Sequence, residues 1–437
     1  MKSQQIGLFK IVARGTIVAL LVKFLSLGAL YFSKLFLARW LGVEEYGIYE
    51  YATALSLFLG FFAGLGFHKA VLRLISEYIV KQNWPDLRGL IRASWLQTLA
   101  ASIAIAALGT GFIVWLNSWR GLNHQTSLIL GLWLVPAIAL MQLQKEMMRA
   151  LKRIGLAYAP LEVLLPLLLL GIAWLWQQNH GQLTSEVVLV LCLLSLLLLV
   201  AIQLASFPLV FPQATYHFPP HYQLKYWQKI SLSMLLTDSS FLIVKYTDTL
   251  MLGSWLGSQE VGIYSAALTT AAWVNFILVA VNAIAAPLFA SLYAKENFQG
   301  LQKLVSSISK LVFIPAFLGA CGLILFANPL LGLFGPEFVA AKWALITLTL
   351  GQLVNVGVGS VGYLLTMTGH QKQSAKVMSW SATTNIILNL ICIPYFGIFG
   401  AAIATAISMA LWNLWSHRLV VNYLKIDPSI VGAWGKG

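Results

Sequence analysis

The sequence has little charge and very little cysteine. Charged residues make up 10% of its 437 positions, whereas an average soluble domain has roughly 25%. Water is therefore not the main solvent for most of this surface. The three cysteines, Cys192, Cys321 and Cys392, lie in apolar stretches without CxxC spacing. This pattern indicates neither a disulfide framework nor a zinc site, and we expect no metal or cofactor.

Common catalytic and nucleotide-binding motifs are missing too. The chain has no GxxxxGK[ST] phosphate loop, no HExxH and no GxSxG. Residues 357–362 match GxGxxG, but no strand is predicted before them and no acidic residue follows at the right distance. We interpret these glycines as a site of close packing or bending in an apolar helix. The sequence thus predicts a protein that is not an enzyme.

Apolar residues dominate what is present. They make up 59% of the chain, the mean hydropathy is +0.80, and apolar runs reach the roughly 20 residues that cross a bilayer as a helix. The runs lack the period-2 alternation of barrel strands, so we predict an all-α integral membrane protein with about 12 transmembrane helices. The expected spans are 12–38, 46–66, 93–116, 128–144, 156–176, 186–206, 229–253, 261–290, 308–327, 341–367, 376–395 and 399–420.

The distribution of basic residues predicts the orientation in the membrane. Most of the 28 lysines and arginines fall in the two termini and the even-numbered loops, whereas the odd-numbered loops hold Arg39, Arg120 and Lys342. Both termini are therefore expected in the cytoplasm of a multi-pass inner (plasma) membrane protein. The net charge of +14 is divided among short loops, which argues against nucleic-acid binding. The basic N-terminus resembles a signal peptide, but Lys23 interrupts its apolar region, so we expect a retained first helix.

An internal repeat divides the chain. Residues 40–49 read WLGVEEYGIY, and residues 255–264, 215 positions later, read WLGSQEVGIY. Six predicted helices separate the two copies, so both halves enter the membrane in the same orientation. This is a parallel repeat with a pseudo-two-fold axis along the membrane normal. We predict an N-terminal six-helix lobe at 1–207, a cytoplasmic linker at 208–228 and a C-terminal six-helix lobe at 229–437.

Three stretches carry a family resemblance: ARWLG at 38–42 with YGIY at 46–49, AVLRLISEY at 70–78, and DTLMLG at 248–253 leading to GIY at 262–264. With them, the chain resembles the multidrug/oligosaccharidyl-lipid/polysaccharide exporter superfamily, and most closely its Wzx-type polysaccharide flippases. The resemblance implies a MATE-like fold whose central cavity is lined mainly by helices 1, 2, 7 and 8. It also implies outward transfer of an anionic, polyprenyl-pyrophosphate-linked oligosaccharide. We expect a functional monomer among membrane lipids, working with other polysaccharide-assembly membrane proteins.

Four charged residues inside predicted spans are the main site candidates. A charge at the bilayer centre costs about 2.5–3.5 kcal/mol on insertion scales, so it normally faces a cavity or a partner. The repeat offset maps Lys23 onto Asp238, and we expect these two to face each other. In the functional interpretation Lys23 and Lys245 attract the pyrophosphate, while Asp238 and Asp248 orient them or carry a coupling H⁺ or Na⁺. In the structural alternative, all four form a buried ion-pair network that only fixes the lobe interface.

Four further residues are weaker candidates for substrate binding. Asn275 and Asn282 in helix 8 suit sugar recognition, although such asparagines are about as often interhelical hydrogen-bonding groups. Lys69 and Arg73 follow helix 2 and could receive a phosphate at the cytoplasmic mouth. Their alternative role is the ordinary positive charge of a cytoplasmic loop.

Other functions remain open on sequence alone. A multidrug exporter of the same superfamily would use acidic residues to bind cations, but helix 1 has Lys23 and no acid. A membrane-embedded glycan polymerase or ligase needs external catalytic groups, for which the short outer loops leave little room. A lipid II flippase would resemble relatives with fourteen helices, more than the twelve expected here. Because no ATP-binding motif is present, movement must draw on ion or potential gradients.

Overall fold

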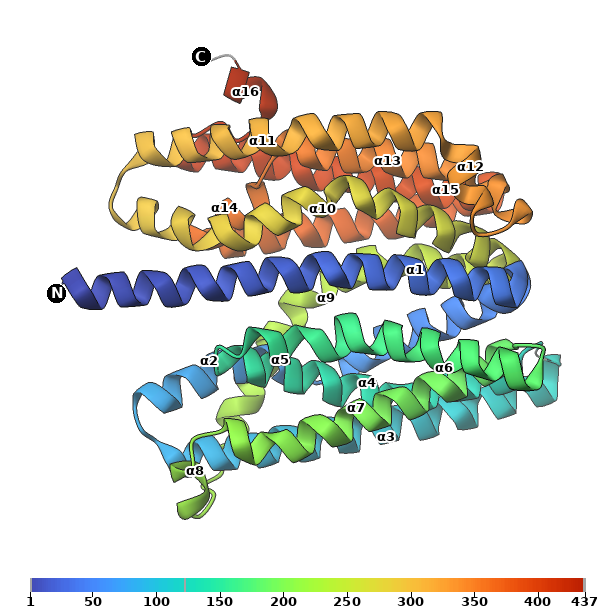
Figure 1. Cartoon of the computed structure of the whole chain (residues 1–437), viewed down its shortest axis with the longest axis horizontal. Helices are drawn as coiled ribbons and strands as arrows, with labels where there is room; N and C mark the ends of the chain where they lie inside the picture. Colours follow the sequence, from blue (N-terminus) through green and yellow to red (C-terminus); the bar gives the residue numbers. More distant parts are fainter. Residues whose placement is uncertain (1, 122, 435–437) are drawn as a thin grey trace. The chain divides into compact units, whose positions relative to one another are not determined.

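The computed structural model describes the backbone of residues 2–121 and 123–434, and side chains from Lys23 onward except at positions 120, 216, 237 and 283. Every regular element in these ranges is helical (Figure 1). The elements are α1 (Lys2–Ala63), α2 (Phe67–Val80), α3 (Trp84–Arg120), α4 (Gln125–Ala150), α5 (Ile154–Ala159), η1 (Pro160–Leu164), α6 (Leu165–His180), α7 (Ser185–Val210), α8 (Ala214–His217), α9 (Leu224–Trp255), α10 (Ser258–Ala294), α11 (Phe298–Leu325), α12 (Ala327–Gly332), η2 (Pro336–Ala341), α13 (Lys342–Val358), α14 (Val361–Met367), α15 (Gln371–Leu424) and α16 (Ile430–Trp434).

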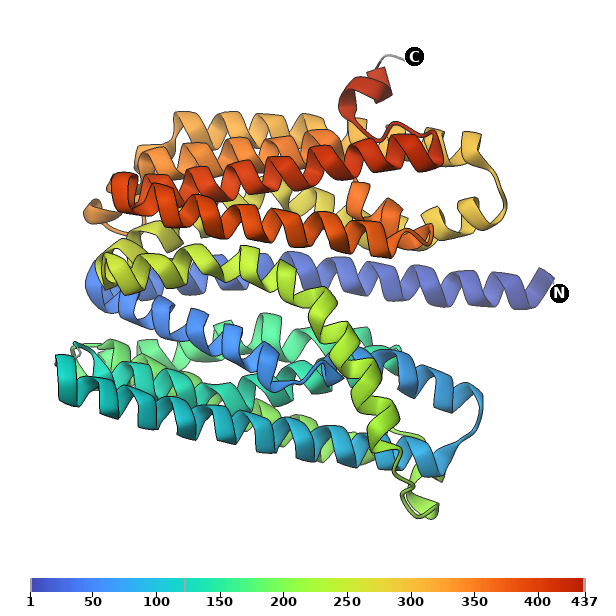
Figure 2. The same ribbon diagram turned by 180° about the vertical axis from the view of Figure 1, so that it is seen from behind.

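The predicted number of membrane spans agrees with these helices. Among the described residues, nine helices are long and apolar enough to cross a bilayer. Two of them each contain two predicted spans, because α1 breaks at Gly42 and α15 breaks at Gly397. Figure 2 shows the two halves of α15, in orange-red and red, side by side and antiparallel. With the charged helix α9 as a further span, the fold is the predicted all-α arrangement of about twelve.

The chain folds into two compact units. The N-unit comprises residues 17–41 and 48–239, and the C-unit comprises residues 1–16, 42–47 and 240–437. The division falls between Ser239 and Ser240, inside the continuous helix α9. The predicted linker, 208–228, lies earlier in the chain than this division, and the lobe boundaries stay a prediction.

The core of the N-unit forms around a tryptophan from α9. Trp227 is fully buried among apolar side chains of α2, α3 and α4, which include Phe67, Leu87 and Met147. Its indole N–H donates a hydrogen bond to the Tyr78 hydroxyl at 2.9 Å, which satisfies the polar atom of this large apolar side chain. The beginning of α9 is therefore an integral part of the N-unit. In the C-unit, Phe289 of α10 is fully buried in a cluster that includes α11 and α14 side chains.

The two copies of the repeat fold alike. Gly42 and Gly257 occupy the same position in the repeated motif, and their φ angles are 77° and 101°, with ψ at 173° and 179°. A residue with a side chain rarely adopts this backbone conformation, which explains the glycine at both positions. The copies also touch each other within the C-unit, because a Cβ on Gly262 would lie 3.2 Å from the Gly47 Cα and 2.5 Å from the Val43 carbonyl oxygen.

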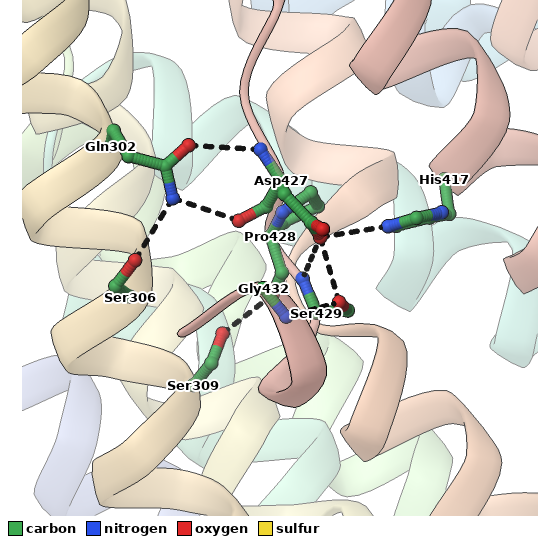
Figure 3. A network of polar contacts seen from close by, with 8 residues as sticks. All are labelled: Gln302, Ser306, Ser309, His417, Asp427, Pro428, Ser429 and Gly432. Carbon is green, nitrogen blue, oxygen red and sulfur yellow. Dashed lines mark hydrogen bonds and ion pairs between the residues drawn. The ribbon is translucent and has the colours of Figure 1, made fainter. Parts of the chain in front are cut away.

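A polar network fixes the chain after α15 to the C-unit (Figure 3). The Asp427 carboxylate accepts hydrogen bonds from His417 Nε2 at 2.9 Å and from the Ser429 hydroxyl at 2.7 Å. Gln302 of α11 both donates to the Asp427 carbonyl and accepts from its N–H, each at 2.9 Å. The Ser309 hydroxyl donates to the Pro428 carbonyl at 2.6 Å. These bonds connect the segment to α11 and α15.

Replacing Asp427 by asparagine is expected to lower the melting temperature at neutral pH and weaken its acid dependence. Burial raises the pKa of Asp427, but hydrogen bonds from His417 and Ser429 and the charge of His417 lower it below its ordinary value of 3.8. The ionised carboxylate therefore stabilises the fold above pH 3.8, and this contribution is lost as the pH falls below it. We expect a loss of about 1 kcal/mol, measured by thermal unfolding in detergent. Ser306→Ala, at the edge of the network, is the control, and equal acid dependence in both variants would contradict the prediction.

Candidate functional site: a charged cluster in the N-unit

Four residues from three parts of the N-unit form a charged cluster inside the bundle. The Glu162 carboxylate lies between two ammonium groups, with Lys23 Nζ at 2.6 Å from Oε2 and Lys145 Nζ at 4.0 Å from Oε1. The Tyr158 ring lies below both cations, at 4.4 Å from Lys23 Nζ and 5.8 Å from Lys145 Nζ. We call Lys23, Lys145, Tyr158 and Glu162 the N-unit cluster. Two lysines and one glutamate give it a net positive charge.

A third cation lies beside the cluster. The Arg149 guanidinium is 5.7 Å from the Tyr158 ring centroid, and its Nη1 donates to both oxygens of Glu146, at 2.9 and 2.6 Å. The electron-rich face of an aromatic ring attracts cations. Tyr158 therefore helps to hold like charges close together that would otherwise repel one another.

The backbone around Glu162 is irregular. The fifth predicted span is divided into α5, the π-helical turn η1 and α6, and the Leu165 N–H donates to the carbonyl of Pro160, five residues earlier. Pro160 begins this turn and lacks an N–H, and Pro166 follows it. Single π-helical turns occur frequently at functional sites. Glu162 is thus carried by a turn that departs from the regular α-helical hydrogen-bonding pattern.

Lys145 and Glu162 lie near the ends of α4 and α5 that face each other across one loop, whereas Lys23 lies in the middle of the first segment of α1. Lys145 is five residues before the end of α4, or about 7.5 Å along the axis, and Glu162 is eight residues after the start of α5, or about 12 Å. The loop that joins these ends is the fourth, which the distribution of basic residues predicts to be cytoplasmic. The side chains of Lys23, Lys145 and Glu162 are 30%, 22% and 21% exposed, so the cluster is partly open.

The charged residues have other partners than those expected from the repeat. Lys23 pairs with Glu162, whereas Asp238 pairs with Lys69 of α2 at 3.3 Å. A further pair joins Lys34 Nζ and Glu50 Oε2 at 2.7 Å. The structure therefore does not bring Lys23 and Asp238 together as an ion pair, although both belong to the N-unit.

Asp248 and Lys245 lie in the C-unit part of α9 and differ in environment. Asp248 is 1% exposed, and its carboxylate accepts hydrogen bonds from the Tyr264 hydroxyl at 2.6 Å, the Thr249 N–H at 2.7 Å and the Thr405 hydroxyl at 3.1 Å. Among the residues described, it has no cationic side chain as partner. Lys245 is exposed, and its ammonium lies 5.0 Å from the Tyr246 ring centroid.

The weaker candidates are dispersed. Asn282 is buried and its Oδ1 accepts a hydrogen bond from the Ser360 hydroxyl, which is the geometry of an interhelical contact. Asn275 has a buried Oδ1 with no hydrogen-bond partner among the described residues. Arg73 is exposed on α2, one turn beyond Lys69. The structure brings none of these residues into the N-unit cluster.

Sequence reasoning missed three members or neighbours of the cluster: Lys145, Tyr158 and Arg149. The predicted fourth span ended at residue 144, so Lys145 and Arg149 were counted as loop charges, whereas α4 continues to Ala150. The signal that could have found them is the run of apolar and helix-forming residues through 150, which gives no reason to end the helix earlier. Glu162 lies inside the fifth predicted span, 156–176, where an acidic residue normally faces a cavity or a partner.

Comparisons with known proteins agree with this fold. The family described as polysaccharide biosynthesis protein matches residues 12–293, and the MatE family matches residues 230–391. In Haloferax volcanii, the "Probable flippase AglR" is 27% identical over 188 residues, and the "Probable low-salt glycan biosynthesis flippase Agl15" is 29% identical over 185 residues. These matches cover 42% and 41% of this chain, and only 40% and 39% of the relatives' lengths.

The fold is also similar to a solved structure described as the inward-facing conformation of a multidrug resistance MATE family transporter of the MOP superfamily. The TM-score is 0.75 at 16% sequence identity, and the alignment covers 94% of this chain and 99% of the other. This likeness shows that the two chains share a fold. Because the family match spans well over half of the sequence, the chain belongs to the polysaccharide biosynthesis protein family.

Proposed function

We propose that the protein flips a polyprenyl-pyrophosphate-linked oligosaccharide from the cytoplasmic to the outer leaflet by alternating access, for cell-surface polysaccharide biosynthesis. Family membership and a relative named as a glycan biosynthesis flippase support this proposal. The observation that carries it is the N-unit cluster, where Lys23 and Lys145 share a single carboxylate inside the bundle. An excess of ammonium groups suits an anionic head group.

The position of the cluster supports a functional role. Charged side chains within membrane-spanning segments usually face a cavity or a transported group. Lysine suits phosphate because it is a compact point charge with three donors. The predicted orientation places the cluster toward the cytoplasm, where the head group would be received. The prenyl tail would stay in the lipid, because only the polar part needs to be shielded from it.

The energy source follows from the charge of the cargo. An inside-negative membrane potential favours outward movement of an anion by about 2.3 kcal/mol per charge per 100 mV. Asp248 is a candidate for ion coupling. Its fully buried carboxylate accepts hydrogen bonds from hydroxyl and amide donors, and binding of H⁺ or Na⁺ would balance its negative charge. We place the protein in the inner membrane with both termini in the cytoplasm, surrounded by membrane lipids and acting as a monomer.

A MATE-like multidrug exporter is the second candidate. The similar MATE structure supports the fold alone, since only 16% of residues are identical. A cation exporter needs acidic groups free to bind a positive drug, and Asp248 is the residue that favours this alternative. The N-unit cluster has the opposite sign of charge. We therefore rank lipid-linked glycan above cationic drug.

Reconstitution tests the proposal directly. Purified protein in liposomes is expected to expose a fluorescent polyprenyl-pyrophosphate oligosaccharide from the inner leaflet to a membrane-impermeant quencher, while leaving a fluorescent phosphatidylcholine inside. The same vesicles loaded with a cationic dye test the second candidate. Dye release without movement of the glycan lipid would overturn the proposed function in favour of drug export.

A further inference from the structure

Glu162 occupies the place in the cluster that an anionic ligand would take. Its two oxygens each face one ammonium group, Lys23 at 2.6 Å and Lys145 at 4.0 Å. A phosphate group offers the same arrangement of oxygens around one centre. We propose that the Glu162 carboxylate is an internal competitor for the head-group site. The substrate's pyrophosphate displaces this carboxylate from the two lysines, and the carboxylate returns to them when the substrate leaves. This inference rests on the proposed function and assigns a role to a residue that the function itself does not require.

The charge balance makes the competition effective. With Glu162 ionised, one of the two ammonium charges in the cluster is already neutralised. A pyrophosphate diester brings two acidic groups, so it can neutralise both ammoniums once the carboxylate has moved away. Charge-assisted hydrogen bonds of this kind are roughly twice as strong as neutral ones, so losing either partner without replacement is costly. Exchange of one anion for another avoids leaving the lysines unpaired.

The neighbouring titratable groups do not compete for the two lysines as Glu162 does. Glu146, the other carboxylate close by, is held by Arg149 through two hydrogen bonds from one nitrogen. His68 of α2, which interacts electrostatically with Lys145, is buried, and burial together with the charges of Lys69 and Lys145 lowers its pKa to about 3. His68 thus stays neutral at physiological pH. Glu162 is the carboxylate shared between the two lysines.

The backbone gives Glu162 the means to move. The π-helical turn η1 places it between Pro160 and Pro166, where the regular α-helical ladder is already interrupted. Such turns occur mostly as single bulges inside α-helices and frequently at functional sites. The Glu162 side chain is 21% exposed, so it has space on one side of the pair. By contrast, Glu50 in the Lys34 pair is 9% exposed and lies in the α-helical segment of α1 that follows the break at Gly42.

Glu162→Gln separates competition from simple support of the lysines. The purified full-length chain in detergent is titrated with farnesyl pyrophosphate, and the same variants are assayed for glycan-lipid flipping in liposomes. We expect Glu162→Gln to bind farnesyl pyrophosphate about tenfold more tightly than the wild type and to flip more slowly, because release loses its returning anion. Glu50→Gln removes the carboxylate of another lysine pair in the same unit and is expected to leave the affinity unchanged.

Other outcomes discriminate clearly. Equal or weaker binding by Glu162→Gln, in a wild type that binds and flips, overturns the competitor role and leaves the proposed function standing. A wild type that neither binds farnesyl pyrophosphate nor flips the glycan lipid overturns both. If Glu162→Gln does not fold, Glu162→Asp takes its place, because its shorter side chain moves the carboxylate away from Lys23 and is also expected to tighten binding.

Discussion

Replacing Gly47 by alanine is expected to lower the free energy of unfolding by about 1–3 kcal/mol and to reduce transport. A Cβ at this position would lie 1.8 Å from the Ser258 carbonyl oxygen and 3.0 Å from the Gly262 nitrogen. Both are backbone atoms, which cannot rotate away as a flexible side chain would. The contact must open, and overpacking of this kind typically costs a few kcal/mol. Thermal unfolding in detergent and the liposome flipping assay measure the two effects.

Gly171→Ala is the matched control for this substitution. Gly171 lies in α6, and no atom is within 4 Å of a Cβ built at that position. Alanine is the better helix former by about 1 kcal/mol, so this variant should be as stable as the wild type or slightly more stable. The same chemical change is thus expected to have opposite signs at the two sites. Equal stability of Gly47→Ala and Gly171→Ala would show that the close contact of Gly47 with Ser258 and Gly262 contributes nothing to the free energy of unfolding.

Replacing Lys23 by alanine is expected to reduce flipping by at least about tenfold. The substitution removes a charge-assisted contact of the kind worth about 1.5–3 kcal/mol, and a loss of 1.4 kcal/mol is a factor of ten. It also leaves Glu162 without its closer cation, because the remaining lysine, Lys145, is 4.0 Å away. The free energy of unfolding should therefore fall by about 1–3 kcal/mol. Thermal unfolding and initial rates of flipping measure the two effects.

The double variant Lys23→Ala/Glu162→Gln distinguishes a binding role from a structural ion pair. Removing both charges relieves the unpaired carboxylate, so stability should return close to the wild-type value. If Lys23 binds the head group, the double variant flips more slowly than Glu162→Gln alone, in spite of the recovered stability. Recovery of flipping together with stability would mean that the pair only holds α1 against η1, which is the structural alternative raised for the intramembrane charges.

Local sequence patterns predicted the fold well because each pattern has a local physical cause. Apolar runs of membrane length predicted the spans, and the repeated motif predicted related halves, whose equivalent residues Gly42 and Gly257 have the same backbone conformation. The interpretation of residues 357–362 as a bend is supported as well. Gly359 ends α13 with a φ of 84°, and a Cβ there would meet the Pro428 carbonyl oxygen.

The partners of the intramembrane charges depended on packing that no local pattern contains. Lys23 and Glu162 are 139 positions apart, and nothing near either residue indicates the other. The repeat offset suggested Asp238 for Lys23, because equivalent positions of two repeats are expected at the same depth with opposite charges. Equivalent depth does not determine contact, and each residue pairs instead with a side chain of another helix, Glu162 for Lys23 and Lys69 for Asp238. A shift of six residues at the end of α4 was enough to hide Lys145 and Arg149 among loop charges.

The contact between Gly47 and Gly262 has the geometry of an isologous interface. In a symmetric homodimer, a residue that touches its own copy lies on the two-fold axis, and it must fit itself from both sides. Equivalent residues of the two repeats meet in this way within one chain. At an interface of two identical halves, a larger residue would appear in both halves, and both side chains would enter the same contact. If the two repeats were once identical chains in contact, glycine is the residue that fits against its own copy at this position. In the single chain, a larger residue at either position would still collide with the backbone at the other.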